Sequence, residues 1–310
     1  MTLASETPAG ASSTSPLARA ALVVAQPDRT AITAVGKDAV SWLNGLVTCD
    51  LAKLRPGEAA YGLVVEKKGR IRVDLFVVPR TRGEGPPSLA LFVPAGKRDE
   101  VLALLDHHLI MEDVELAAAD LALFAVHGEA AEGLVGAAPW GGRLDLLGHG
   151  GAVLAAPAAE RDALAATLAR EAEARGGLVA DEATWERVRI EAGLPRFGVE
   201  VDDTLYPQEA GLEKIAVSFS KGCYLGQEVG YMLENRGHVK RKLVPLALEG
   251  AEVPAPGASV TTPEGEVVGE VKSSALGPSR GAPVAIAMIK YAQTKPGTEL
   301  RVGEAVARVR

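Results

Sequence analysis

The chain has 310 residues, of which 47% are hydrophobic and 24% charged, and its formal net charge at pH 7 is -7. This length exceeds a single hydrophobic core, so we expect two or three packed units, and the negative charge argues against broad binding to nucleic acid or to an anionic membrane. No apolar run approaches the roughly 20 residues that cross a bilayer. Cys49 and Cys223, the two cysteines, lie in unrelated contexts, which argues against a disulfide framework and favours the cytoplasm.

The first part of the chain alternates short apolar runs with amphipathic stretches. Residues 1–16 are rich in Ser, Thr, Ala and Pro and are expected to form a disordered tail. Helices are predicted near Asp38, where Gly45 should end the first one, and at 97–109, where apolar residues recur at helical spacing. Strands are predicted at 21–25, 31–35, 61–65, 73–78 and 89–93.

A second set of elements follows, with the same mixture of strands and helices. Asp181 is a good N-cap for the last helix of this set, which Gly193 and Pro195 should end. The sequence thus predicts two α+β domains within 17–241, either consecutive or interleaved along the chain. The strands of this set are predicted at 114–118 and 121–126, and its first helix at 158–175.

From Lys242 onward, short apolar runs are broken by Gly and Pro, which is typical of a small antiparallel barrel. We therefore predict a C-terminal β-barrel domain at 242–310 and an α+β fold class for the whole chain. The strands of the barrel are predicted at 243–248, 258–261, 266–271, 285–290 and 299–309.

The segment from Lys221 to Glu228 reads Lys-Gly-Cys-Tyr-Leu-Gly-Gln-Glu and joins a predicted strand at 215–219 to a predicted helix. Cys223 thus precedes a helix N-terminus, where free backbone N–H groups and the nearby Lys221 favour a thiolate. The competing interpretation is that Cys223 is a small buried hydrophobe in a tight turn. We favour a functional thiol for Cys223 and a core position for Cys49.

We predict no metal site. One motif cysteine cannot hold an iron–sulfur cluster alone, because such clusters usually take four protein ligands. His107 and His108 are adjacent, so their side chains point to different sides of a helix and make a poor metal pair.

The segment at 221–228 closely resembles the signature Lys-Gly-Cys-Tyr-x-Gly-Gln-Glu of the YgfZ branch of the folate-binding T-protein family, which is aminomethyltransferase-like. The resemblance extends over about residues 30–245. It is carried further by Val35 to Ala39 with Thr48 to Leu51, by Gly69-Arg70-Ile71 with Asp74, and by Arg189 to Pro195 leading through Gly198 and Glu200 to Pro207, Glu209, Gly211 and Leu212.

This resemblance implies two α+β domains and a barrel around a central channel that binds tetrahydrofolate or a derivative. Glu209 occupies the place of the glutamate that recognises the pterin, and a carboxylate can accept two parallel N–H bonds from an aminopyrimidine edge. Arg236, Lys240 and Arg241 either meet the glutamate tail of folate or form a solvated basic face. The folate-binding residues expected from the resemblance are Glu209, Tyr224, Gln227, Glu228, Arg236 and Arg241.

The resemblance further implies a non-catalytic helper that supports assembly or repair of iron–sulfur clusters, including those of enzymes that thiomethylate tRNA. Its expected partners are iron–sulfur client proteins and folate, without direct contact to nucleic acid or membrane. In the related aminomethyltransferase, the aspartate near the reactive folate nitrogen lies in a segment that follows a strand and contains an asparagine. Pro94 replaces that asparagine here, and Asp99 matches the aspartate only across a gap of one residue.

Two alternatives stay open. The first is an enzyme, a folate-dependent aminomethyltransferase or demethylase with Asp99 as its acid. The second is a folate-regulated binding module in which Cys223 only packs. Release of ammonia from an aminomethyl donor would identify the enzyme, and replacement of Cys223 by Ser would separate the helper from the module.

Overall fold

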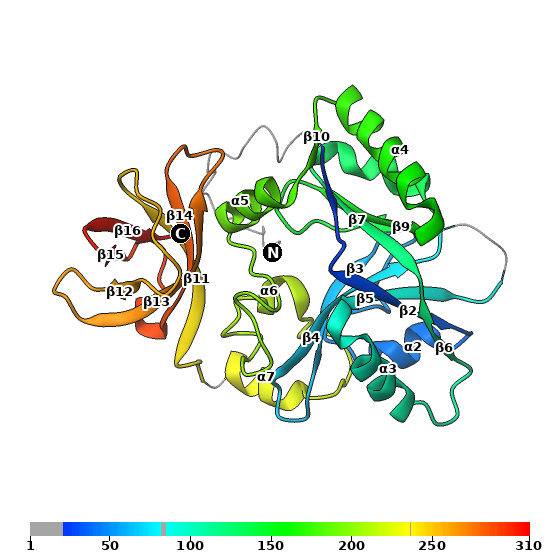
Figure 1. Cartoon of the computed structure of the whole chain (residues 1–310). Coiled ribbons are helices and arrows are strands. Elements are labelled where there is room, and N and C mark those ends of the chain that lie inside the picture. The colour runs from blue at the N-terminus through cyan, green and yellow to red at the C-terminus, as the bar shows by residue number, and fades with distance from the viewer. Residues whose placement is uncertain (1–20, 82–84, 236) are drawn as a thin grey trace, which may run out of the picture.

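The computed structural model describes residues 21–81, 85–235 and 237–310 and contains two mixed α+β layers beside a closed barrel (Figure 1). The predicted α+β class with a C-terminal barrel is confirmed. The predicted tail at 1–16 lies outside the described residues. Within the described ranges, no helix is long and apolar enough to cross a membrane.

The first sheet is antiparallel and has the order β3-β4-β5-β2-β6. Alternate residues of a strand face opposite sides, and here both sides are covered: Leu75 packs toward the helices, whereas its neighbour Phe76 packs toward the second sheet. The first sheet and its helices comprise β2 (Arg29–Val35), β3 (Ala60–Val65), β4 (Ile71–Pro79), β5 (Ser88–Pro94), β6 (Glu115–Ala119), α2 (Ala39–Asn44) and α3 (Arg98–His107).

The second sheet has the order β10-β1-β7-β9-β8, with β1 and β10 parallel and the other pairs antiparallel. Because β1, the first strand of the described residues, belongs to this sheet, the two α+β units are interleaved. Leu164, Leu168 and Ala172 of α4 cover one face. The elements are β1 (Leu22–Ala25), β7 (Leu121–His127), β8 (Trp140–Arg143), β9 (Gly151–Pro157), β10 (Leu178–Ala180), α4 (Arg161–Ala174) and the 3-10 segment Glu129–Ala137.

Helix α5 (Glu182–Ala192) connects the sheets to the barrel, and its predicted caps are confirmed. Asp181 accepts a hydrogen bond from the N–H of Thr184 at 2.8 Å, and Gly193 ends the helix in the left-handed conformation with φ of 77°. On its barrel side, the Glu191 carboxylate accepts bonds from both backbone N–H groups of Ser279 and Arg280 and from the Ser279 hydroxyl.

The predicted strand at 215–219 is wrong. The structure has a one-turn helix, α6 (Glu213–Ala216), followed by an irregular segment that leads to α7 (Gln227–Asn235). The physical reason is that the backbone groups of this segment bond to Thr48 and not to a neighbouring strand. The Thr48 hydroxyl donates to the backbone oxygen of Ala216 at 2.6 Å, and the backbone oxygen of Thr48 accepts from the Ser218 N–H at 2.9 Å. These bonds hold the segment without a sheet ladder.

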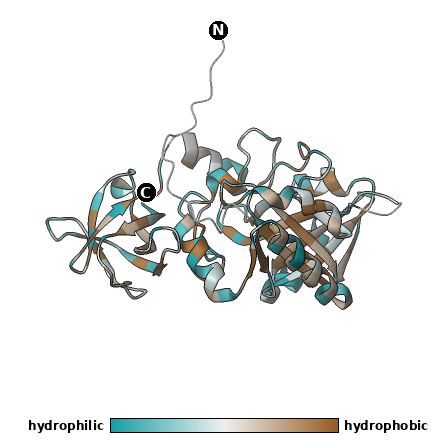
Figure 2. Ribbon diagram, turned by 90° about the horizontal axis from the view of Figure 1, so that it is seen from above, coloured by the Kyte–Doolittle hydropathy of each residue, from teal (hydrophilic) through white to brown (hydrophobic). Residues whose placement is uncertain are grey.

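The barrel closes in the order β11-β14-β13-β12-β15-β16 around an apolar interior that includes Leu246, Val271 and Leu300. It lies at one end of the molecule, with the two sheets at the other (Figure 2). The predicted strand at 299–309 is two strands joined by a turn at Gly303-Glu304. The strands are β11 (Arg241–Leu248), β12 (Ser259–Thr261), β13 (Val267–Leu276), β14 (Pro283–Lys290), β15 (Glu299–Val302) and β16 (Ala305–Val309).

Candidate functional site

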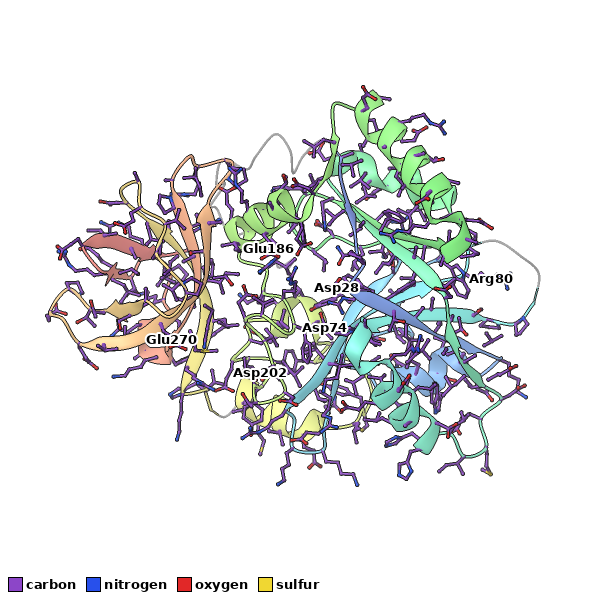
Figure 3. All side chains as sticks on the ribbon, viewed as in Figure 1. Asp28, Asp74, Arg80, Glu186, Asp202 and Glu270 are labelled. Atoms are coloured by element: carbon purple, nitrogen blue, oxygen red, sulfur yellow. The ribbon has the colours of Figure 1, made fainter. Side chains whose placement is uncertain are left out.

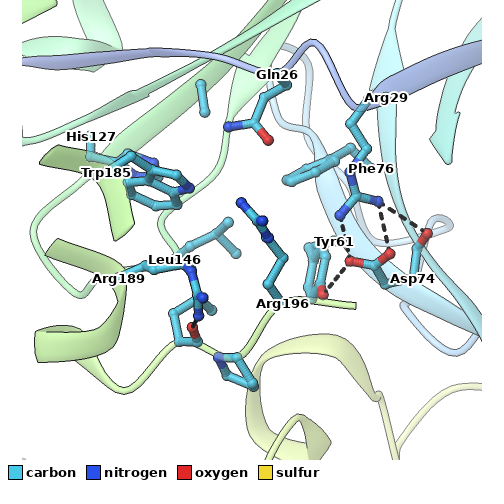
Figure 4. A pocket seen from close by; sticks show the side chains of 13 residues that line it. Gln26, Arg29, Tyr61, Asp74, Phe76, His127, Leu146, Trp185, Arg189 and Arg196 are labelled. Carbon is cyan, nitrogen blue, oxygen red and sulfur yellow. Dashed lines mark hydrogen bonds and ion pairs between the residues drawn. The ribbon is translucent and has the colours of Figure 1, made fainter. Parts of the chain in front are cut away.

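A cavity of about 40 Å³ lies where the two sheets meet α5, and we call it the inter-sheet cavity (Figure 4). Strands β3 and β4 of the first sheet, β7 of the second sheet and helix α5 all contribute to its wall. In Figure 3, Asp74 on β4 and Glu186 on α5 lie on the two sides of this region. The polar and aromatic side chains that line it include Gln26, Arg29, Tyr61, Asp74, His127, Trp185, Arg189 and Arg196.

On the first-sheet side, a buried ion pair occupies the wall. The Arg29 guanidinium donates to both carboxylate oxygens of Asp74 at 2.8 Å, and the Tyr61 hydroxyl donates to Asp74 Oδ2 at 2.8 Å. Burial would lower the pKa of Arg29, but the Asp74 charge and hydrogen bonds raise it above its usual value. Burial, and then Asp74, raise the pKa of the Tyr61 phenol, which therefore stays protonated and donates. Arg29 Nε has no hydrogen-bond partner among the described residues.

On the second-sheet side, His127 is 2% exposed and stacks flat on Trp185, with ring centroids 4.9 Å apart and planes inclined by 4°. Burial lowers the pKa of His127 to about 4, so the imidazole is neutral at pH 7. Within the described part of the chain, neither of its ring nitrogens has a hydrogen-bond partner.

The α5 side of the cavity is formed by paired arginines. Arg189 is 1% exposed and donates to Glu186 and, at 2.9 Å, to Glu200 Oε1. Arg196 Nη1 lies 2.9 Å from Glu186 Oε1 and also contacts Glu182. Each guanidinium thus has a carboxylate partner, so this wall carries little net charge.

The motif predicted to carry the chemistry lies elsewhere, against the loop that follows α2. Cys223 is exposed and precedes α7, as the sequence indicates. Gly226 has φ of 78° and sits so close to the Glu66 oxygen that an added Cβ would lie 2.4 Å from it. Among the described residues, no group of three or more His, Cys, Asp or Glu side chains could hold a metal ion.

Lys221 does not share an open cleft with the Cys223 thiol. Its ammonium is buried and donates to the backbone oxygens of Val47 at 2.7 Å and Cys49 at 2.8 Å, and to that of Asn44. Its Nζ also lies 5.0 Å from the centre of the Tyr224 ring. Burial lowers the pKa of Lys221 to about 8, which leaves the ammonium charged at neutral pH.

Cys49 and the remaining motif residues, Tyr224, Gln227 and Glu228, differ in how deeply they are buried. Cys49 is buried, and burial raises its pKa to about 12, which agrees with the predicted core position. Tyr224 is 8% exposed, and burial raises its pKa to about 12. Gln227 is half-buried and Glu228 is exposed in the first turn of α7.

Glu209 lies at the junction between the loop before α6 and the first barrel strand. Its carboxylate accepts the Tyr206 N–H at 3.1 Å and lies 3.6 Å from Arg241 Nε, and its backbone oxygen accepts the Leu243 N–H at 2.7 Å. Arg241 and Lys240 are exposed. Arg236, the remaining predicted residue, lies outside the described residues.

Asp99 is on the outside of the molecule. Its side chain is 90% exposed in the first turn of α3, where Oδ1 lies 3.3 Å from Arg98 Nε. Pro94 ends β5 and pairs with Arg29 of β2. The structure therefore places Asp99 in solvent, whereas the carboxylate within the inter-sheet cavity is that of Asp74.

The structure thus separates the predicted residues from the inter-sheet cavity, whose described lining includes neither Cys223 nor Glu209. Four residues of this cavity are not recognisable from the sequence as site residues: Arg29, Tyr61, His127 and Trp185. Arg29, Tyr61 and His127 each lie in an apolar strand. A polar side chain near the end of such a strand is the only sequence feature that could have indicated them. Arg29 begins β2 and His127 ends β7.

Comparison with known proteins gives matches to two domain families. Residues 20–139 match the GCVT N-terminal domain, and residues 241–309 match the glycine cleavage T-protein C-terminal barrel domain. The chain is 28% identical over 296 residues to an aminomethyltransferase of Nostoc sp., which covers 87% of this chain and 77% of the relative. It is also 28% identical over 303 residues to the mitochondrial aminomethyltransferase of Mus musculus, covering 86% and 72% of the two chains.

Among solved structures, the fold resembles the glycine cleavage system aminomethyltransferase T from Bartonella henselae. The TM-score is 0.76 at 23% sequence identity, and the match covers 94% of this chain and 85% of that one. At this identity the likeness concerns the fold alone.

Proposed function

Because the chain belongs to the glycine cleavage T-protein family, we propose that it binds a tetrahydrofolate and acts as a non-catalytic helper of iron–sulfur proteins, as the YgfZ branch does. The non-catalytic part rests on one observation. Asp99, the residue that would serve as the acid in an aminomethyltransferase, has a side chain 90% exposed and lies away from the inter-sheet cavity. A general acid must reach the atom that it protonates.

Folate binding is supported by the family and by the polar atoms of the inter-sheet cavity. Aminomethyltransferases of this family use tetrahydrofolate. Arg29 Nε and both ring nitrogens of His127 are buried without partners in the described structure, and such atoms are costly unless a ligand or water satisfies them. Glu209 offers a further acceptor near the barrel, but its carboxylate already contacts Tyr206 and Arg241. Folate would compete with Arg241 for it.

The helper role is supported by the exposure of Cys223. A single accessible thiol suits a transient contact with a client protein, a sulfur transfer or a redox response, whereas a resident cluster usually needs four ligands. The turn that carries the thiol is fixed on both sides, because Lys221 donates to backbone oxygens and Gly226 packs closely against the Glu66 oxygen.

A folate-dependent aminomethyltransferase is the second candidate, and the comparisons favour it over the helper role. The curated relatives named above are aminomethyltransferases, at 28% identity, and neither name mentions iron–sulfur proteins. For this candidate to be correct, either the start of α3 moves to bring Asp99 to the folate, or Asp74 replaces it after release from Arg29 and Tyr61.

Three measurements test the proposal. Calorimetric titration with tetrahydrofolate should give saturable binding, and its absence would refute the folate site. An aminomethyl donor added with tetrahydrofolate should release no ammonia. Ammonia release that disappears in Asp99→Asn or Asp74→Asn would instead establish the enzyme and identify its acid.

The third measurement concerns the thiol. In cells that lack the protein, Cys223→Ser should fail to restore the activity of iron–sulfur enzymes under oxidative stress, while it binds tetrahydrofolate like the parent. Ser220→Ala, an exposed neighbour on the same segment, is the control and should restore activity fully. Full restoration by Cys223→Ser would show that the thiol is not needed.

A further inference from the structure

The inter-sheet cavity collects buried polar atoms that have no partner. Five buried side-chain nitrogen or oxygen atoms lack a hydrogen bond in the described structure, and three of them, Arg29 Nε and the two ring nitrogens of His127, belong to residues lining this cavity. A buried polar group left unsatisfied costs about 1–3 kcal/mol, so their concentration at one place points to a ligand.

The imidazole of His127 is held by its neighbours, but its two ring nitrogens make no hydrogen bond in the described structure. Its backbone pairs with Leu22 of β1 on one side and Gly151 of β9 on the other. Trp185 covers one face of the imidazole in a parallel stack, so the ring nitrogens remain the groups available for hydrogen bonding (Figure 4). The neutral imidazole offers one donor and one acceptor.

The free atoms define the chemistry of the group that would bind them. Arg29 Nε and one nitrogen of His127 are donors, and the other nitrogen of His127 is an acceptor. The two ring nitrogens of His127 point apart, so one amide edge pairs with one of them: its N–H donates to the acceptor nitrogen, or its carbonyl oxygen accepts from the donor nitrogen. A carboxylate suits the site less well. It has no hydrogen to donate to the acceptor nitrogen of the imidazole, and the negative charge of Asp74 beside Arg29 would repel it.

The size of the cavity limits how much of a ligand can enter. A volume of about 40 Å³ has room for a few water molecules or for one small polar group. A complete heterocycle would enter only if the cavity walls moved. The outer edge of such a ring fits into the cavity as it stands.

We propose that His127 is a ligand-binding residue that receives the amide-type edge of a planar heterocycle, with Trp185 holding its imidazole in place. The inference rests on the proposed function, in that the heterocycle is the pterin of a tetrahydrofolate. It adds a recognition point on the second sheet to the one that the family resemblance implies for Glu209.

Replacement of His127 by Phe tests the inference, because Phe keeps a flat ring on Trp185 and removes both nitrogens. We expect the Kd for tetrahydrofolate, measured by calorimetry, to rise at least about tenfold. The melting temperature of the free protein should stay the same or rise, because two unsatisfied polar atoms are lost from the interior. His107→Phe, at an exposed position on α3, is the control and should leave the Kd unchanged.

His127→Gln provides a second variant, since its amide retains one donor and one acceptor, and we expect it to bind more tightly than His127→Phe. In the parent protein, the ¹⁵N chemical shifts of the His127 ring should change when tetrahydrofolate is added. Equal affinity of the parent and both variants, with unchanged ring shifts, would overturn the role of His127 and leave folate binding intact. A parent protein that binds no tetrahydrofolate would overturn the proposed function and this inference together.

Discussion

Cys223 and Lys221 stand two positions apart in the same motif but occupy opposite environments. The thiol is exposed, whereas the ammonium of Lys221 is enclosed by backbone oxygens of the loop at 44–49. A charge buried in this way is stabilised by its hydrogen bonds, and it ties two distant segments together. Lys221 therefore anchors the turn that presents Cys223, rather than acting as an exposed cation beside the thiol.

Lys221→Met keeps most of the side-chain stem but leaves the carbonyl groups of Val47 and Cys49 without their donor. We expect the free energy of unfolding to fall by about 3 kcal/mol, because several buried acceptors lose a charged partner at once. Urea denaturation measures this change. Lys53→Met is the control: its side chain is 65% exposed, so its effect should stay within about 0.5 kcal/mol. Similar losses for both variants would contradict an anchoring role.

Among the secondary-structure elements, those with a strong local signal could be predicted from the sequence. Continuous apolar runs predicted β4 and β5, and Asp181 with Gly193 predicted α5. Strands β8, β9 and β10 were not predicted: Trp-Gly-Gly-Arg carries two glycines, Gly-Ala-Val-Leu-Ala-Ala-Pro is rich in Ala, and Leu178–Ala180 is only three residues long. None of them has a clear alternating pattern.

Of the candidate site residues, too, only some could be predicted from the sequence. The exposed Cys223 could be anticipated, because its motif is continuous in sequence. The inter-sheet cavity could not, because Arg29, His127 and Trp185 come from three elements that only the tertiary fold brings together. No spacing along the chain relates them. An Arg or His at the end of an apolar strand indicates a special environment but does not identify its partners.

The turn before α7 has a sharp backbone requirement at one glycine. In Gly226→Ala, the new Cβ would lie 2.4 Å from the Glu66 oxygen, and the residue would keep a left-handed conformation that alone costs about 1–2 kcal/mol. We expect the free energy of unfolding to fall by at least this amount and the alkylation rate of Cys223 to change. Gly222→Ala in the same motif has open space around the added carbon and should be nearly neutral. A Gly226→Ala protein as stable as Gly222→Ala would show that the turn can adjust.

At the scale of the whole molecule, the buried imidazole between the sheets affects stability as a function of pH. The folded pKa of His127 is about 4, against about 6.5 in an unfolded chain, so between these values the unfolded state binds the additional proton. Stability from this group is therefore complete above about pH 6.5 and decreases as the pH falls toward 4, by roughly 3 kcal/mol in total.

Denaturation curves at pH 7 and pH 4.5 test this expectation for the parent and for His127→Phe. The parent should lose more stability on acidification than the variant, because Phe has no proton to bind. Equal losses of stability in the parent and the variant would mean that His127 is not responsible for the acid sensitivity.

The pairing of β1 with β10 has a consequence for how the protein is made. Leu22 lies beside Leu178, so β1 leaves the ribosome 156 residues before its parallel neighbour β10. At about 5–20 residues per second, this interval lasts on the order of 8–30 s. During it, the apolar Leu-Val-Val-Ala strand lacks one of its two partners and presents an open edge. Translation pauses before β10 should therefore increase aggregation of the nascent chain, whereas pauses within the barrel should have little effect.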